Sequence, residues 1–141
     1  MKKTVTTIIS AMLTLICILS LASCGKTDTE KLWEKATYSE DTEFGSGATT
    51  VQIKVRVGER AVTFTIHTDK TTFGDALLEH GLIAGDVEQY GLYVKVVNGI
   101  TADYDVNQSY WGFYQDGEYL MTGVDSTEIA DGEHYEIVYS K

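Results

Sequence analysis

Cysteine, proline and basic residues are scarce in this 141-residue sequence. Of its two cysteines, Cys17 lies within an apolar amino-terminal run and Cys24 closes that run, so the residues that follow contain no thiol. A stabilising disulfide is therefore excluded there. The fold must be held together by packing, which a domain of about 90 residues can achieve. The absence of proline excludes no fold class by itself.

Basic residues are outnumbered by acidic ones, 11 to 21. Every acidic residue follows Cys24, whereas Lys2 and Lys3 precede it, so the part after Cys24 carries nine basic and 21 acidic residues and a net charge of −12. A nucleic-acid partner needs a basic footprint, and this balance argues against one. We interpret the acidity as favouring solubility rather than as a binding surface.

Motifs for catalysis are also missing. His67, His80 and His134 fall in three separate predicted elements, and neither Gly-x-Ser-x-Gly nor His-Glu-x-x-His occurs. No set of side chains provides a nucleophile, a base and an orienting group together. We therefore predict that the protein is not an enzyme.

One acidic segment, residues 103–109, begins like a calcium loop, with oxygen-bearing side chains at alternate positions. Gln108 stands where such a loop needs glycine, and Tyr114 stands where it needs a bidentate glutamate. We interpret the segment as a set of Asx-type turns, with calcium as the alternative. The sequence thus predicts no metal site.

The first 23 residues have the layout of a signal peptide. Lys2 and Lys3 precede a mostly apolar run, residues 8–21, and Leu-Ala-Ser-Cys at 21–24 matches the lipobox of bacterial lipoproteins. We predict cleavage before Cys24 and lipidation of its thiol, which would anchor an extracytoplasmic protein to the bacterial cell membrane. An uncleaved transmembrane helix is the alternative, because the run approaches the roughly 20 residues that span a bilayer.

Residues 24–48, between the lipidated cysteine and the predicted domain, are expected to form a flexible tether that ends in Gly-Ser-Gly. Thr27 and Glu30 have the spacing of a capping box, which allows a short helix inside the tether. Trp33 is expected to make only a loose contact. A chain of this kind would hold the domain, residues 49–141, roughly 25–30 Å from the membrane.

Alternating apolar and polar residues predict a hairpin at the start of the domain. Its strands cover residues 50–57 and 60–67, and Gly58-Glu59 fits the two-residue turn between them. A helix over residues 72–80 follows, because a threonine cap precedes apolar residues at helical spacing and Gly81 can end it in a left-handed conformation. This helix is expected to cover the apolar face of the sheet.

The rest of the domain is predicted to be mostly strands. Residues 82–91 are expected to be a loop, residues 92–97 a strand that ends at an Asn-Gly turn, and residues 134–139 the last strand. Two further strands flank Asp116-Gly117. We therefore predict an α+β fold, with a β-grasp-like antiparallel or mixed sheet and one short helix packed on it.

Aromatic residues are concentrated in the last third of the sequence. In the strand over residues 110–114, Trp111 and Phe113 share one face, while Tyr110 and Tyr114 share the other and Gly112 is expected to leave a flat gap between them. Only one face can belong to the core, so the other is a candidate surface for stacking on a ligand. Cross-strand packing of tyrosines is the structural alternative.

The order of these motifs resembles the transcobalamin-like C-terminal domain family over residues 50–141. Residues 91–99, GLYVKVVNG, resemble the family's glycine-tyrosine strand and its turn, and Tyr110-Trp111 resembles its aromatic-tryptophan pair. Gly123-Val124 resembles its glycine-aliphatic step, and Asp131-Gly132-Glu133 its turn before the last strand.

The resemblance implies a corrinoid ligand, because in the cobalamin carriers this domain covers one face of the corrinoid through the tryptophan strand. By position it implies contacts from Tyr110, Trp111 and Phe113, and we add Tyr93 and Tyr114 as candidate ligand-binding residues from the same aromatic set. No cofactor is implied apart from cobalamin as a ligand. The carriers also have a large helical domain with no counterpart in this sequence, so a second binding domain or an importer is an expected partner.

Two functions remain open at this point. One is a membrane-anchored binding lipoprotein that captures a cobalamin-like ligand for uptake. The other is a surface protein-interaction or adhesion module with no small-molecule ligand, since open sheet edges and tyrosine-rich surfaces also bind proteins.

Overall fold

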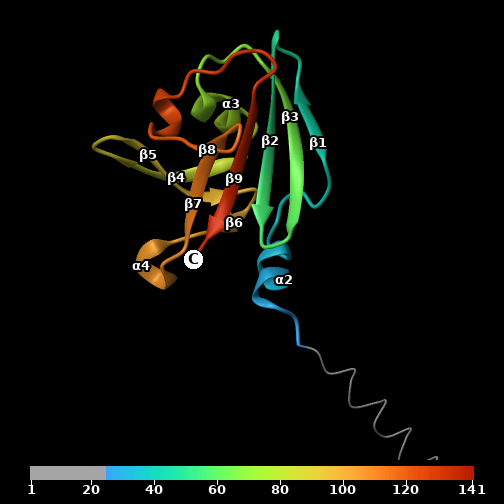
Figure 1. The fold of residues 1–141 in the computed structure, drawn as a ribbon, viewed down its shortest axis with the longest axis vertical. Helices are drawn as coiled ribbons and strands as arrows, with labels where there is room; N and C mark the ends of the chain where they lie inside the picture. Colours follow the sequence, from blue (N-terminus) through green and yellow to red (C-terminus); the bar gives the residue numbers. More distant parts are fainter. Residues whose placement is uncertain (1–24) are drawn as a thin grey trace, which may run out of the picture.

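The computed structural model describes residues 25–141, which form an α+β fold (Figure 1). The predicted signal peptide and the predicted lipidation site, Cys24, lie outside the described residues. Among residues 25–141, no helix is long and apolar enough to cross a membrane.

The larger sheet has six strands in the order β1-β3-β2-β9-β7-β8. These strands are β1 (Thr42–Gly45), β2 (Thr49–Val57), β3 (Arg60–Thr68), β7 (Tyr110–Gln115), β8 (Glu118–Tyr119) and β9 (His134–Ser140). Two neighbouring pairs, β1 with β3 and β2 with β9, are parallel, and the other pairs are antiparallel. The predicted mixed sheet is therefore confirmed, as are the hairpin at Gly58-Glu59 and the turn at Asp116-Gly117.

A second sheet contains β4 (Ile83–Glu88), β5 (Gly91–Val97) and β6 (Ile100–Thr101), in that order. The prediction of a loop over residues 82–91 is wrong, because β4 pairs with β5 along its length. The register shifts between Ala84 and Gly85, and a Cβ on Gly85 would lie 1.9 Å from the carbonyl oxygen of Tyr93. β4 is thus defined by its backbone pairing with β5 and by the close approach of the β5 backbone to Gly85. It lacks the alternation of apolar and polar side chains from which a strand is predicted.

The helices are short: α2 (Asp28–Trp33), α3 (Phe73–Glu79), α4 (Tyr104–Asn107) and the 3-10 turn η2 (Val124–Ser126). In α3 the Thr72 side chain caps the helix by accepting from the amide of Asp75, and Gly81 has a φ of +65° just after it. These are the start and stop predicted from the sequence. The prediction did not include α4.

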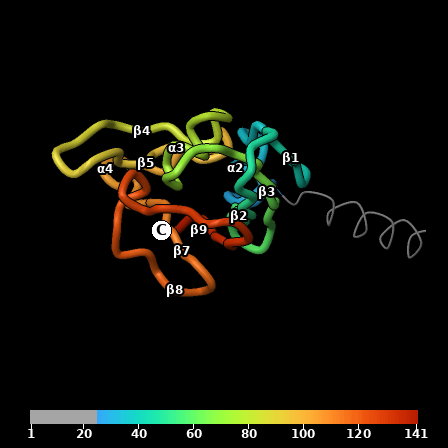
Figure 2. Tube along the Cα trace, turned by 90° about the horizontal axis from the view of Figure 1, so that it is seen from above, coloured from blue at the N-terminus to red at the C-terminus, as the bar shows by residue number. Residues whose placement is uncertain are grey.

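The core lies on one face of the large sheet, beneath α3. Alternate residues of β2 and β3 are buried there, which confirms the predicted faces of the hairpin. From α3, Phe73 stacks on Tyr135 with 4.3 Å between ring centroids and meets the edge of Phe113 at 6.2 Å. Figure 2 shows α3 on the same side of the large sheet as the β4–β5 hairpin.

The prediction of a flexible tether over residues 24–48 is wrong for β1 and for Trp33, whereas the short helix that the capping box allowed is present as α2. The capping box of Thr27 and Glu30 is formed, and Trp33 is only 5% exposed, with its indole Nε1 donating to the carbonyl of Val57 at 3.1 Å. β1 adds a parallel strand to β3, so the folded domain begins well before residue 49. The polar composition of this segment suggested a tether. The contacts that order it could not be predicted locally, because the partners of Trp33 and β1 lie in the later β2–β3 hairpin.

Candidate functional site

A groove with a volume of about 320 Å³ lies between the small sheet and the edge of the large one. Residues 92–94 of β5 form one wall, Tyr110, Trp111 and Phe113 of β7 form the other, and residues 119–124 close the rim. We call this the aromatic groove. None of its lining residues is charged, although the sequence after Cys24 contains 30 charged residues.

Trp111 joins the two walls of the aromatic groove. Its indole Nε1 donates to the carbonyl oxygen of Lys95 on β5 at 3.2 Å, and its ring meets the edge of Tyr139 on β9 at 5.5 Å. Trp111 is 5% exposed, so only a small part of its ring faces the groove. Trp111 therefore mainly holds the two walls at a fixed spacing and offers little surface to a ligand.

Asp125 fixes the start of β5. Its carboxylate Oδ2 accepts a hydrogen bond from the amide of Leu92 at 2.8 Å. The preceding Gly91 has a φ of +114°, and a Cβ there would lie 2.8 Å from the same oxygen. Only glycine allows the carboxylate to approach the chain this closely. This contact links η2 to the wall that carries Leu92 and Tyr93.

The rim over residues 119–124 is held at both ends and is apolar in the middle. The amide of Leu120 donates to the carbonyl of Phe113 at 2.8 Å, and the Thr127 hydroxyl donates to the carbonyl of Gly123 at 2.9 Å. Between these contacts, Met121 is 90% exposed. An exposed, unbranched thioether side chain can adapt its shape to a ligand.

The structure brings together four of the five predicted ligand-binding residues. Tyr93, Tyr110, Trp111 and Phe113 all line the aromatic groove. Tyr110 faces solvent, being 42% exposed, whereas Trp111 and Phe113 pack toward the core. The face of β7 that carries Trp111 and Phe113 is thus the core face.

Tyr114 does not line the groove, and the expected flat gap at Gly112 is wrong. A Cβ on Gly112 would lie 3.1 Å from Cε2 of Tyr114, so the tyrosine ring already covers the glycine. The same ring meets the edge of Tyr119 with 5.4 Å between centroids. Tyr114 therefore packs on its own strand and on β8, as in the alternative of cross-strand tyrosine packing.

Sequence reasoning missed the rim residues Tyr119, Leu120 and Met121, and it missed Asp125. The rim had a detectable signal, because three large apolar residues in a row, one residue after an Asp-Gly turn, are unusual on a solvated loop. Asp125 had none, since its partner amide belongs to a residue 33 positions earlier.

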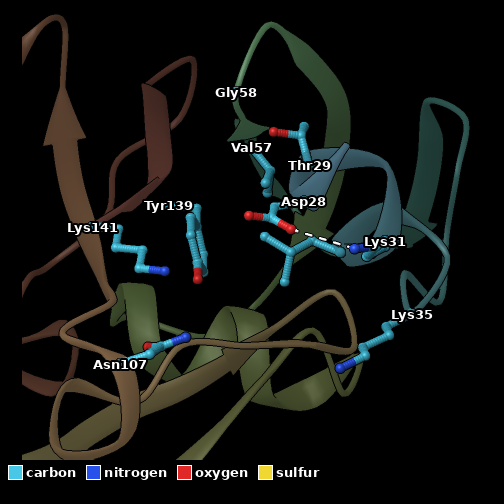
Figure 3. Close-up of a pocket in the computed structure, with 10 residues that line it drawn as sticks. Asp28, Thr29, Lys31, Lys35, Val57, Gly58, Asn107, Tyr139 and Lys141 are labelled. Atoms are coloured by element: carbon cyan, nitrogen blue, oxygen red, sulfur yellow. Dashed lines mark ion pairs between the residues drawn. The ribbon is translucent and has the colours of Figure 1, made fainter. Parts of the chain in front are cut away.

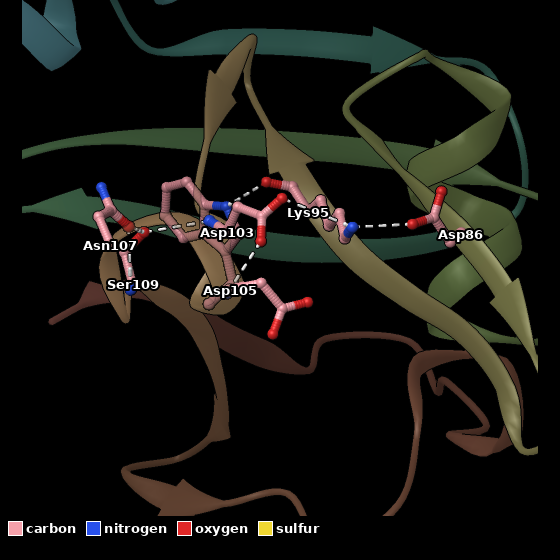
Figure 4. Close-up of polar contacts among 7 residues, drawn as sticks. Asp86, Lys95, Asp103, Asp105, Asn107 and Ser109 are labelled. Atoms are coloured by element: carbon pink, nitrogen blue, oxygen red, sulfur yellow. Dashed lines mark hydrogen bonds and ion pairs between the residues drawn. The ribbon is translucent and has the colours of Figure 1, made fainter.

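The acidic segment 103–109 contains the helix α4, which was not predicted, with an Asx-type contact at each end, as interpreted from the sequence. Asp103 caps α4 by accepting from the amide of Asp105 at 3.0 Å, and Asn107 accepts from the amide of Ser109 at 3.1 Å (Figure 4). Lys95 reaches Asp86 at 2.9 Å and Asp103 at 3.6 Å. The hydrogen bond with Asp86 raises the pKa of Lys95 above its ordinary value, an effect that desolvation opposes.

The carboxylate of Asp103 therefore has partners within the chain, and a cation there would compete with Lys95. No group of three or more His, Cys, Asp or Glu side chains suited to a metal ion occurs within residues 25–141.

Comparison with known proteins assigns a family. The model of the DUF4430 family, a domain of unknown function, matches residues 70–141. The chain belongs to the DUF4430 family. In this DUF4430 protein the matched region contains α3, both walls of the aromatic groove and Asp125. Among curated proteins, none matches the sequence.

Two crystal structures share the fold of this DUF4430 protein. One is a "putative metal binding protein" from Ruminococcus gnavus ATCC 29149, 29% identical, with a TM-score of 0.63 over 66% of this chain and 97% of that one. The other is haptocorrin in complex with Cbi, 21% identical, with a TM-score of 0.55 over 70% of this chain. The match spans 26% of the haptocorrin chain, so it shows a shared fold over about a quarter of that protein.

Proposed function

We propose that this DUF4430 protein is an extracytoplasmic lipoprotein, anchored through Cys24, that binds the apolar face of a flat or extended ligand in the aromatic groove. A corrinoid is the first ligand to test. The protein delivers the ligand to an importer or a second binding domain and performs no chemistry on it.

The observation that carries the proposal is the uncharged lining of the aromatic groove in a strongly acidic domain. Binding sites for small molecules are concave, largely apolar and rich in aromatic side chains, with volumes of about 300–1,000 Å³. The aromatic groove has these properties, although at about 320 Å³ it is small. It can therefore contact only part of a large ligand, which supports a second binding partner.

Support for a corrinoid comes from the haptocorrin complex with Cbi, whose fold this domain shares. It comes also from the resemblance of Tyr110-Trp111 to the tryptophan strand of the cobalamin carriers, since both residues line the aromatic groove. At 21% identity the likeness to haptocorrin shows the fold alone, so corrinoid binding by this protein is part of the proposal.

Calorimetric titration of residues 25–141 with cobinamide, cobalamin and an unrelated porphyrin tests the proposal. We expect saturable binding of a corrinoid in the micromolar range, weakened at least about fivefold by Tyr110→Ala and by Met121→Ala, as for contacts worth about 1 kcal/mol or more. Tyr90→Ala is the matched control, because Tyr90 is 91% exposed and lies outside the groove. Equal binding of the porphyrin would indicate a general flat-ligand site, and no binding of any of the three would contradict the proposal.

A protein-interaction module is the second candidate, and β4 favours it. β4 is an edge strand of the small sheet and is exposed over most of its length, with Val87 87% exposed. An open edge of this kind can accept a strand from a partner. Val87→Lys would abolish such binding and leave the aromatic groove intact.

A further inference from the structure

α2 begins only four positions after Cys24, the proposed lipidation site, in the sequence. Thr27 caps α2, and Trp33 fixes the helix to the end of β2. Thr27 is three positions after Cys24 in the sequence, and an extended chain covers at most about 3.6 Å per residue, or about 11 Å here. If Cys24 is lipidated, as the proposed function assumes, the α2 end of the domain must face the membrane at close range.

The α2 end carries a hollow with a volume of about 530 Å³ (Figure 3). α2, α4 and the carboxyl end of β9 lie at this end of the domain, opposite α3 (Figure 1). Three lysines, Lys31, Lys35 and Lys141, line the hollow, and Asp28 is its one acidic residue. We call it the lysine hollow. Its lining is net positive in a domain whose net charge is −12.

The carboxylates of α2, Asp28 and Glu30, and that of its C-cap residue Glu34 already have partners in the chain. Asp28 lies 3.5 Å from Lys31, Glu34 pairs with Lys26, and Glu30 accepts from the amide of Thr27 in the capping box. Lys35 and Lys141 form no ion pair within residues 25–141. These two ammonium groups are therefore available to an external anion.

Two apolar side chains extend the same end of the domain. On α4, Tyr104 is 55% exposed and Val106 is 79% exposed, and the neighbouring Asn107 lines the lysine hollow. Lysines beside exposed tyrosine and aliphatic side chains are typical of surfaces that rest on the headgroup region of a bilayer. Asp105, between the two apolar residues, is the one carboxylate on α4 and opposes this contact.

We propose that the α2 end docks on an anionic phospholipid surface, with a headgroup phosphate in the lysine hollow and the α4 side chains at the interface. The lipid on Cys24 supplies the anchor, and the hollow sets the orientation of the domain. Two observations favour a membrane over a soluble partner. The lysines of the hollow complement anionic headgroups, and the short connection to Cys24 holds this end of the domain near the bilayer.

Flotation of residues 25–141 with vesicles tests the docking without the anchor. These residues contain the whole described fold, whose buried core begins at Trp33. We expect binding to phosphatidylcholine vesicles that contain phosphatidylglycerol, little binding to phosphatidylcholine alone, and loss of binding at high salt. Lys35→Gln with Lys141→Gln should weaken binding about 25-fold, because each basic residue near the surface contributes about fivefold.

Lys54→Gln with Lys70→Gln is the matched control, because both side chains are exposed and lie on β2 and just after β3. An equal loss in this control, or equal binding to both kinds of vesicle, would overturn the proposal. Tyr104→Ser with Val106→Ser should also weaken vesicle binding. Binding of inorganic phosphate without binding to vesicles would overturn docking as well.

Corrinoid titration of the lysine variants separates the two proposals. Variants that no longer float with vesicles but bind cobinamide normally would support docking at a site distinct from the aromatic groove. If the wild-type domain binds vesicles and no flat ligand, the docking stands and the proposed ligand fails.

Discussion

The indole of Trp33 donates a hydrogen bond to the carbonyl oxygen of Val57, 24 residues later, at 3.1 Å. The guanidinium of Arg60 covers the same indole ring, 4.6 Å from its centroid. Trp33 thus packs on the turn end of the β2–β3 hairpin and connects α2 to the domain. The amino-terminal segment is consequently part of the fold.

Trp33→Ala should reduce the free energy of unfolding by about 3–5 kcal/mol, the usual cost of truncating a buried tryptophan. Trp33→Phe should cost less, because the ring remains and the lost hydrogen bond accounts for about 1 kcal/mol. Urea denaturation of residues 25–141 measures both. Tyr104→Ala, an exposed aromatic residue, is the control and should change stability by less than about 0.5 kcal/mol. If the Trp33→Ala protein were as stable as the wild type, Trp33 would not hold this segment to the domain, and the prediction of a flexible tether would be correct.

Sequence reasoning succeeded where the partners of a residue are close in the chain. The β2–β3 hairpin follows from alternation over two adjacent strands and a turn at Gly58, and α3 follows from the cap at Thr72 and the stop at Gly81. It failed for Trp33 and for residues 38–45 because their partners are distant. The amide of Tyr38, for example, pairs with the side chain of Asn98, 60 residues later.

The aromatic groove shows the same division. The strand pattern of residues 110–114 identified Tyr110, Trp111 and Phe113, and the groove contains all three. Alternation could not show that the Tyr114 ring folds back over Gly112, since this depends on a side-chain rotamer. Nor could it show that Asp125 holds Leu92, since that contact arises only when η2 meets β5.

Asp125→Ala should loosen the β5 wall of the aromatic groove. The Leu92 amide would lose its acceptor, and a hydrogen bond to a charged group contributes about 1.5–3 kcal/mol. We expect faster hydrogen exchange at Leu92 and weaker ligand binding, with Asp125→Asn intermediate because its amide oxygen can still accept. Glu118→Ala removes an equal charge from the exposed β8 and should leave both measurements unchanged. Unaltered exchange at Leu92 in Asp125→Ala would show that Asp125 does not position this wall.

Gly91→Ala tests the same wall through its backbone. An alanine Cβ would lie 2.8 Å from Oδ2 of Asp125, at a φ of +114° that alanine rarely adopts. We expect a loss of more than about 1 kcal/mol in the free energy of unfolding. Gly123→Ala is the matched control in the rim, because Gly123 has a φ of −64° and a methyl group added there would meet no atom within 4 Å beyond its chain neighbours. It should be neutral or stabilise by up to about 1 kcal/mol. Equal effects of the two substitutions would contradict the close packing at Gly91.

Tyr135 predicts how stability changes at alkaline pH. Burial of its phenol, followed by the hydrogen bond that it donates to Glu133, raises the pKa of Tyr135 well above its usual value of 10.0. The folded protein therefore keeps this proton at pH values where the unfolded chain has lost it. Stability is fully present below pH 10 and falls above it, because the unfolded state then binds fewer protons than the folded state.

The slope that one such group adds is at most about 1.4 kcal/mol per pH unit. Tyr135→Phe has no proton to lose at this position, so its free energy of unfolding should fall less steeply above pH 10 than that of the wild type. Urea denaturation at a series of pH values between neutral and strongly alkaline measures the difference. Tyr90→Phe, at an exposed position, should keep the wild-type slope. Parallel curves for wild type and Tyr135→Phe would show that the Tyr135 phenol ionises equally in the folded and unfolded states, against the burial that the structure shows.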